Sequence, residues 1–101
     1  HQDHVHPYTA FETSKLKSVG ITDREMVNTW HYEANTLPNL QLLEGRENES
    51  KNKMTLSEWC EKGNTVAYLD NTISKDIKDF DAFYEHRKQK MLDELTRILD
   101  I

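Results

Sequence analysis

The apolar residues in the last fifth of the chain repeat with helical spacing, and this pattern constrains the fold more than any other feature of the sequence. Apolar positions between residues 80 and 99 lie three, four or seven residues apart, so they share one face of an α-helix of about five turns. The positions are Phe80, Phe83, Tyr84, Met91, Leu92, Leu95, Ile98 and Leu99.

Helix-capping signals predict two further helices. Residues 22–25 (Thr-Asp-Arg-Glu) match the capping box, and apolar residues follow at helical spacing. We expect a helix of about three turns that runs to near Ala34 and ends before Pro38, because the residue preceding a proline is pushed out of the helical region. A second box at residues 55–58 (Thr-Leu-Ser-Glu) predicts a short helix that Gly63 closes.

Short extended segments complete the expected fold. Residues 1–6 suit the end of a strand that Pro7 stops, and residues 40–43 (Leu-Gln-Leu-Leu) suit a brief second strand. A helix is expected to begin after Gly45, whereas residues 15–20 show only a weak pattern that ends in a break at Gly20. The predicted class is α+β and mostly helical. Two strands and a helix form a small core, which receives an inserted helix and precedes the long C-terminal helix.

Length and composition are those of one folded domain. The chain has 101 residues, of which 36% are hydrophobic and 31% charged, and this mixture favours a packed core over disorder. No run of about 18 apolar residues suggests a membrane span, and no secretory signal is visible. Cys60 is the single cysteine and has no partner for an internal disulfide, so a cytoplasmic, reducing setting is expected.

The net charge of −5 is unusual for a protein that binds nucleic acid by itself. Neutralisation of phosphates by lysine and arginine supplies most non-specific affinity, so such domains are usually basic. Either the chain does not bind nucleic acid, or another part of a larger protein supplies most of the binding. Because the sequence begins at His1, already inside a motif, we interpret it as a C-terminal fragment of a longer polypeptide.

Three short motifs combine groups that can hydrolyse a phosphodiester bond. Hydrolysis needs an activated water, neutralisation of the phosphate oxygens and help for the leaving oxygen. His4 is a natural base near neutral pH, while Asp3 and Asn48 offer the hard oxygen ligands that suit Mg²⁺ or Mn²⁺. The motifs are Asp-His-Val-His-Pro at residues 3–7, Asn-Leu-Gln-Leu-Leu at residues 39–43 and Asn-Glu-Ser-Lys at residues 48–51.

This set of motifs resembles the HNH endonuclease family, also called His-Me finger or ββα-metal nucleases. The resemblance implies that Asp3 and Asn48 bind one divalent metal ion, Mg²⁺ or Mn²⁺, and that His4 is the general base. It also implies that Asn39 orients His4 by holding the loop between the strands, and that Lys51 contacts a DNA phosphate. The nine-residue interval from Asn39 to Asn48 equals that in the HNH domain of CRISPR effector nucleases.

A closer resemblance, over residues 3–99, is to the C-terminal nuclease module of GmrSD-type restriction enzymes. It rests on residues 38–48 with Lys51, on Ser-Glu-Trp at residues 57–59, and on the last helix. It implies an HNH domain over residues 1–101, with a catalytic core in residues 1–55 and a helical extension in residues 56–101. The segment between Pro7 and Pro38 departs from the family because it is longer than in minimal HNH enzymes.

The same resemblance implies the partners. Double-stranded DNA would be the substrate, in restriction of modified phage DNA. A nucleotide-dependent, ParB-like domain would lie upstream in the same protein. We add Arg46 and Lys53 to Lys51 as predicted DNA-binding residues, because they flank it in the sequence.

Simpler interpretations of the same residues remain open. The histidines at positions 1, 4 and 6 resemble a surface cluster, and His1 is also a conceivable third metal ligand because it shares strand parity with Asp3. Asn39 suits a turn, Asn48 suits a helix cap, and the alternating charges of residues 46–53 suit a solvated helix face. Other conspicuous residues are expected to be structural: His6, Trp30, His31, Trp59, Cys60 and His86.

Two other functions compete with the nuclease hypothesis. One is a catalytically silent interaction or regulatory module that keeps the HNH shape and docks through its helical tail. The other is a secreted toxin-type nuclease, against which the charge of −5 counts, since such a domain is expected to be strongly basic.

Overall fold

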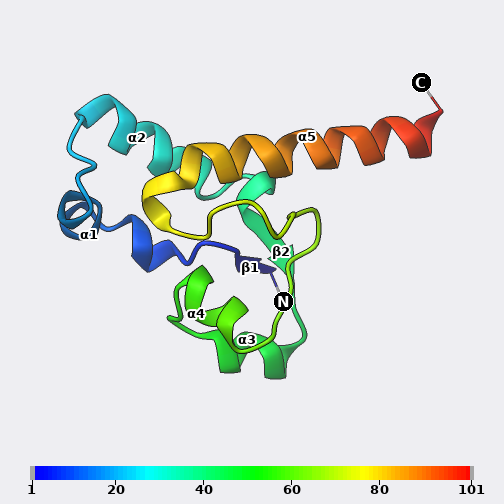
Figure 1. Cartoon of the computed structure of the whole chain (residues 1–101), viewed down its shortest axis with the longest axis horizontal. Helices are drawn as coiled ribbons and strands as arrows, with labels where there is room; N and C mark the ends of the chain where they lie inside the picture. Colours follow the sequence, from blue (N-terminus) through cyan, green and yellow to red (C-terminus); the bar gives the residue numbers. More distant parts are fainter. Residues whose placement is uncertain (1, 101) are drawn as a thin grey trace.

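The computed structural model describes residues 2–100 as a small α+β domain (Figure 1). Short 3₁₀ turns span Tyr8–Phe11, Leu37–Asn39 and Ile77–Asp79. His1, considered above as a third metal ligand, lies outside the described residues. The regular elements are β1 (Gln2–His4), α1 (Thr13–Ser18), α2 (Arg24–Glu33), β2 (Leu40–Leu42), α3 (Gly45–Lys51), α4 (Leu56–Glu61) and α5 (Phe80–Leu99).

The two strands form an antiparallel ribbon that joins distant parts of the chain. Gln2 pairs with Leu42, Asp3 with Gln41 and His4 with Leu40. Helices α1 and α2 lie in the connection between the strands, and two residues separate the end of β2 from the start of α3. The predicted mostly helical α+β class, the inserted helix and the long C-terminal helix are therefore confirmed.

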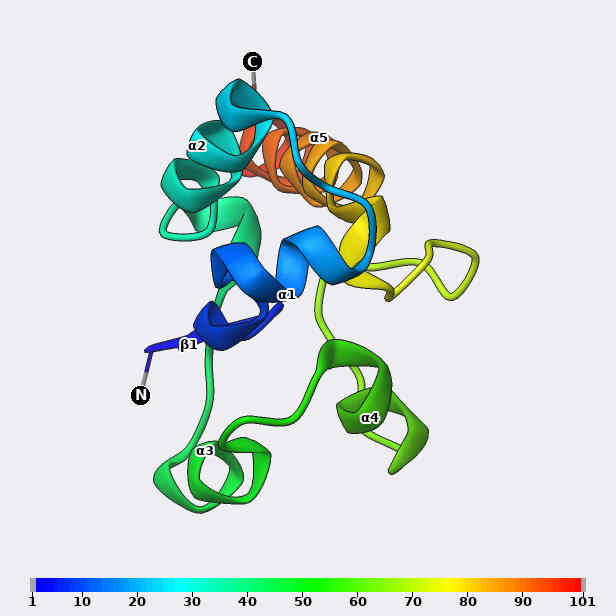
Figure 2. The same cartoon turned by 90° about the vertical axis from the view of Figure 1, so that its left-hand side faces the viewer.

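The hydrophobic core lies under the first half of α5. Phe80 and Phe83 are fully buried there, and Trp30 of α2 is 1% exposed. Trp30 Nε1 also donates a hydrogen bond of 2.7 Å to Asp81 Oδ1, which fixes α2 beside α5. Figure 2 shows these two helices next to each other, with α3 and α4 at the opposite end of the domain. The remaining core residues include Val5, Phe11, Leu16, Val27, Ala34, Leu56, Trp59 and Tyr84.

The second half of α5 extends beyond the body of the domain (Figure 1). Leu92, Leu95, Ile98 and Leu99 are between 48% and 63% exposed. The apolar stripe therefore packs on the domain only along the first half of α5, because the last two turns run past the elements that pack against that half. Across residues 2–100, no helix combines the length and the apolar character needed to cross a membrane.

Arg87 ties α5 to the start of β2. Its side chain is 2% exposed, and its Nη1 donates to the carbonyl oxygens of Pro38, at 2.9 Å, and Leu40, at 3.0 Å. Its Nε donates to the carbonyl oxygen of Ala67 at 3.1 Å. Burial lowers the pKa of Arg87 to about 10, so the guanidinium remains charged at neutral pH.

Local signals located some elements better than others. The box at Thr55 and Glu58 is confirmed, because each side chain accepts a hydrogen bond from the other residue's backbone, and these bonds lower the pKa of Glu58. Gly63 follows α4 with a φ of +92°, as expected for a helix end. The prediction of a capping box at residues 22–25 is wrong, because the N-cap of α2 is Asp23 and its side chain makes no capping hydrogen bond. Helix α1 was not predicted.

Candidate active site at the junction of β1, β2 and α3

Strand β1 presents Asp3 and His4 next to each other. Neighbouring strand residues point to opposite faces, so the two side chains have different partners. Asp3 Oδ2 accepts a hydrogen bond of 2.9 Å from Nε2 of Gln41, its partner in the strand register. The same oxygen lies 3.1 Å from Lys51 Nζ, and the Asp3 side chain is 11% exposed.

Lys51 anchors the last turn of α3 over β1. Its side chain is completely buried, and its Nζ donates a hydrogen bond of 2.8 Å to the carbonyl oxygen of His4 in addition to pairing with Asp3. A solvated helix face is therefore the wrong interpretation for Lys51. A contact between Lys51 and a DNA phosphate requires this ion pair to open, and it stays a prediction.

Asn48 lies on the same face of α3 as Lys51, because residues three apart in a helix are neighbours on its surface. Its side chain is half-buried. Glu44 is the N-cap of α3, and the backbone N–H of Asn48 donates to the Glu44 carbonyl at 2.9 Å, within the helix. Asn48 is therefore not a helix cap.

Asn39 is completely buried and clamps the chain that follows β1. Its Oδ1 accepts from the backbone N–H of His6 at 2.9 Å, and its Nδ2 donates to the carbonyl oxygens of His6, at 3.1 Å, and Ala34, at 3.0 Å. Its own carbonyl oxygen accepts from the Val5 N–H at 2.8 Å. One side chain thus fixes the exit of β1 against the end of α2.

The His4 ring contacts a residue that the sequence did not single out. Its Nε2 lies 2.9 Å from Oδ1 of Asn35, just after α2. An amide oxygen only accepts hydrogen bonds, so Nε2 is the donor, and in the neutral form of the ring the lone pair is then on Nδ1. The ring of Tyr8 lies beside it, with centroids 5.5 Å apart. In sequence, Asn35 resembles an ordinary residue of a helix end, which is why it was missed.

The two other predicted DNA-binding residues are exposed. Arg46 lies in the first turn of α3, and Lys53 follows the end of that helix. Asn52, between Lys51 and Lys53, is also exposed and has a φ of +40°. The structure therefore keeps Arg46 and Lys53 accessible to a ligand, while Lys51 is enclosed.

Asp3 and Asn48 carry the kinds of oxygen ligand that Mg²⁺ and Mn²⁺ prefer. Asp3 is a carboxylate with one oxygen already used by Gln41 and Lys51, and Asn48 is a neutral amide on the facing helix. Mg²⁺ commonly keeps several waters and uses only one or two protein ligands. No group of three His, Cys, Asp or Glu side chains within residues 2–100 is arranged to hold a metal. A site built from one carboxylate and one amide does not need such a group.

The other histidines make structural contacts. His6 is 1% exposed and packs edge-on against Phe83, with ring centroids 4.5 Å apart. Burial, and then the positive charge of Lys51, lower the pKa of His6 to about 3, so its ring is neutral at physiological pH. His31 Nε2 lies 2.6 Å from the Phe11 carbonyl oxygen, and His86 Nε2 accepts from the Asp70 N–H at 3.1 Å.

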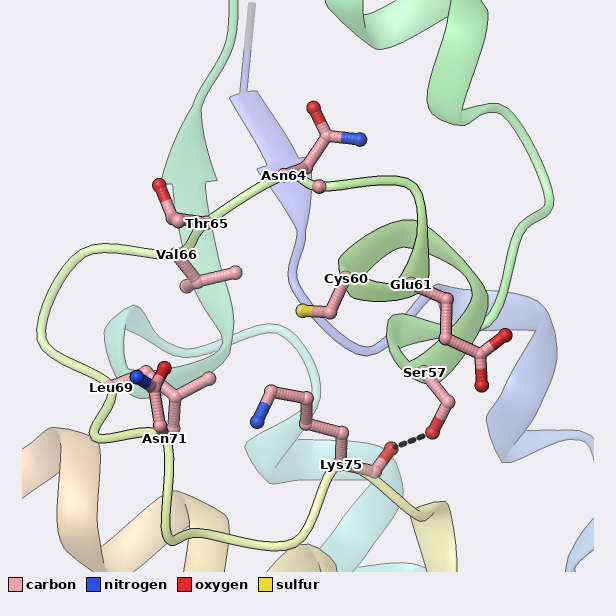
Figure 3. Close-up of a pocket in the computed structure, with 10 residues that line it drawn as sticks. Ser57, Cys60, Glu61, Asn64, Thr65, Val66, Leu69, Asn71 and Lys75 are labelled. Atoms are coloured by element: carbon pink, nitrogen blue, oxygen red, sulfur yellow. Dashed lines mark hydrogen bonds between the residues drawn. The ribbon is translucent and has the colours of Figure 1, made fainter.

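A hollow separate from these residues lies beside α4. Its volume is about 570 Å³, and its walls come from α4 and the loop after it, including Cys60 and Lys75 (Figure 3). None of the seven predicted site residues lines it. Burial raises the pKa of the Cys60 thiol, which favours the unreactive protonated form at neutral pH.

Comparison with known proteins adds no relative. No protein family, curated protein or solved structure matches this chain.

Proposed function

We propose that this chain is a metal-dependent DNA endonuclease module of the HNH type, acting in bacterial restriction of modified phage DNA. The proposal is supported by the succession of two paired strands, β1 and β2, and the helix α3 that follows β2. The ribbon carries Asp3 and His4, and one face of α3 carries Asn48 and Lys51. Asn39, in the loop before β2, holds the exit of β1 in place.

His4 is the general base in this mechanism. Its Nε2–H is held by Asn35, so the lone pair on Nδ1 accepts a proton from the attacking water. The water oxygen forms a new bond to phosphorus as the bond to the 3′ oxygen breaks, which leaves a 5′-phosphate and a 3′-hydroxyl end. Asn39 keeps the backbone after His4 fixed, so that the ring does not have to be repositioned for attack.

Asp3 and Asn48 would hold the metal ion. When bound, Mg²⁺ or Mn²⁺ neutralises the phosphate oxygens and stabilises the departing 3′ oxygen. Lys51 orients the Asp3 carboxylate through the 3.1 Å contact. Gln41 fixes the same oxygen from the neighbouring strand, which leaves the second carboxylate oxygen for the metal.

The proposal places the chain within a larger cytoplasmic restriction protein. A net charge of −5 provides little attraction for DNA, so an upstream ParB-like, nucleotide-dependent domain would capture the substrate and recognise its modification. The ββα-metal core would be residues 1–55, with residues 56–101 as the helical extension.

A second candidate function is a catalytically silent interaction or regulatory module. Two observations favour it: the Asp3 carboxylate is already paired with the buried Lys51 ammonium, and the last two turns of α5 expose four large apolar side chains. A module of this kind keeps the fold and uses the exposed helix to dock on another protein.

Cleavage of supercoiled plasmid tests the proposal. The wild-type chain is incubated with Mn²⁺, with and without EDTA, beside His4→Ala and a control, His86→Ala, in which a histidine on α5 is removed. We expect cleavage that EDTA abolishes, and a loss of at least about a hundredfold for His4→Ala alone, the lower range for removal of a general base. Equal cleavage by folded His4→Ala contradicts the assignment of the base. Absence of cleavage by the wild type at all enzyme concentrations favours the silent module.

A further inference from the structure

A groove of about 260 Å³ lies close to the candidate active site, between α1, the turn after β1, and the link from α3 to α4. Residues far apart in the sequence form it, since Lys15 comes from α1 and Lys53 from the link after α3. Carbon atoms of Ala10 and Val19 contribute to its floor, and Thr9 contributes a hydroxyl group.

The groove gathers positive charge in an acidic protein. Lys15 and Lys53 are both exposed, and neither takes part in an ion pair with another of residues 2–100. By contrast, Lys51 and Lys90 are each paired with an aspartate. The two groove lysines are therefore free to bind an anion without first giving up a carboxylate.

The groove lies close to the candidate active site along the chain. Pro7 lines the groove three residues after His4, and Lys53 follows Lys51 by two. At the extended-chain limit of about 3.3–3.6 Å per residue, these intervals span at most about 11 Å and 7 Å. One DNA strand advances about 3.4 Å along the helix axis per nucleotide. A strand with a phosphate beside His4 would therefore reach the groove within about three nucleotides.

We propose that this groove binds the sugar–phosphate backbone of the DNA strand next to the cleavage site. The ammonium groups of Lys15 and Lys53 pair with phosphates, the Thr9 hydroxyl donates to a phosphate oxygen, and deoxyribose carbons lie over the apolar floor. The inference rests on the proposed function. It adds Lys15, from the segment that departs from the family pattern, to the residues that contact DNA.

A charge-reversal pair tests the groove. The variant Lys15→Glu with Lys53→Glu is compared with Lys62→Glu with Lys88→Glu, whose exposed lysines lie after α4 and on α5. Each replacement lowers the charge by two, so both variants have a net charge of −9 in place of −5. A difference in DNA affinity between the two variants therefore depends on where the lysines lie and not on the total charge. Binding of a labelled 20-base-pair duplex is measured by fluorescence anisotropy in EDTA at several salt concentrations, and plasmid cleavage in Mn²⁺ is measured in parallel. Thermal melting checks that every variant is folded.

We expect the groove variant to lose at least tenfold more affinity than the control variant. Neutralisation of two phosphates accounts for a slope of about −1.8 in log K against log salt, so the groove variant should have a salt dependence shallower by about that amount. Equal weakening of both variants, with cleavage by the wild type intact, overturns the groove and leaves the nuclease proposal standing. Wild-type chain that binds through the groove without cutting overturns the nuclease proposal and keeps the groove. Wild-type chain that neither binds at low salt nor cuts overturns both.

Discussion

At the scale of single residues, the candidate site depends on amide side chains as much as on charged ones. Asn39 holds the exit of β1, Asn35 holds the His4 ring, and Asn48 faces the ribbon from α3. An amide offers both a donor and an acceptor without a charge, so it can fix a backbone or a ring without changing the local potential. The positive Lys51 and the negative Asp3 then set the electrostatics of the site.

Removal of Asn48 tests the metal assignment. If Asp3 and Asn48 are the two protein ligands, Asn48→Ala leaves a hydrated ion with one, so we expect Mn²⁺ affinity to fall at least tenfold. Isothermal titration calorimetry on the whole chain measures it. Asn28→Ala is the control, because Asn28 is an exposed asparagine within α2, away from the candidate site residues in the sequence. Equal Mn²⁺ affinity in the wild type and both variants would move the metal site away from α3.

The residue types of the site were predictable from sequence, but their partners were not. Motif spacing identified Asp3, His4, Asn39 and Asn48 as a group, and the strands and α3 bring their backbones to one junction. The contact between His4 and Asn35 joins residues 31 apart, and the contact between Lys51 and the His4 carbonyl joins residues 47 apart. Such pairings follow from the packing of α2 and α3 against β1, which no local pattern encodes.

At the scale of elements, local chemistry located helices whose signals are contained in a few residues. The capping box at the start of α4 pairs backbone N–H groups with side chains of the same four residues. Those four residues were therefore enough to predict where α4 begins. Helix α1 has six residues and only Leu16 buried, so its apolar pattern is too sparse to recognise. The exposed end of α5 could not be predicted either, since periodicity indicates which face is apolar and not whether another element covers it.

Arg87 is the contact that fixes α5 to the site's scaffold. Replacing it with methionine leaves the carbonyl oxygens of Pro38, Leu40 and Ala67 without their donor. Only the bond to Pro38 is buried, and those to Leu40 and Ala67 are partly exposed, so we expect the free energy of unfolding to fall by about 1–3 kcal/mol, the cost of one buried polar group left unpaired. Urea denaturation followed by circular dichroism measures the loss.

The matched control for Arg87 lies on the same helix. Arg97 is 71% exposed and pairs with Glu94 one turn away, and an ion pair so open to solvent contributes little to stability. Arg97→Met should therefore leave the unfolding midpoint almost unchanged. If the two methionine variants are equally stable, α5 is held by its aromatic face alone, and Arg87 is not the residue that secures β2.

At the scale of the whole molecule, the balance of charges sets how strongly the isolated chain can bind DNA. The net charge is −5, and the exposed cations near the candidate site are Arg46, Lys53 and Lys15. The buried Lys51 already has a carboxylate partner, so it adds little long-range attraction. The domain can therefore position a strand that is delivered to it, but it has few groups with which to capture one.

This balance predicts weak binding by the isolated chain. Three phosphate contacts give a slope of about −2 to −3 in log K against log salt, and we expect a dissociation constant for duplex DNA of about 10⁻⁴–10⁻⁶ M or weaker at physiological salt. Fluorescence anisotropy at two salt concentrations measures both quantities. A pure interaction module should show no binding at either salt. Submicromolar binding by the chain alone would mean that its own surface captures DNA, and the proposed upstream capture domain would then have no role in affinity.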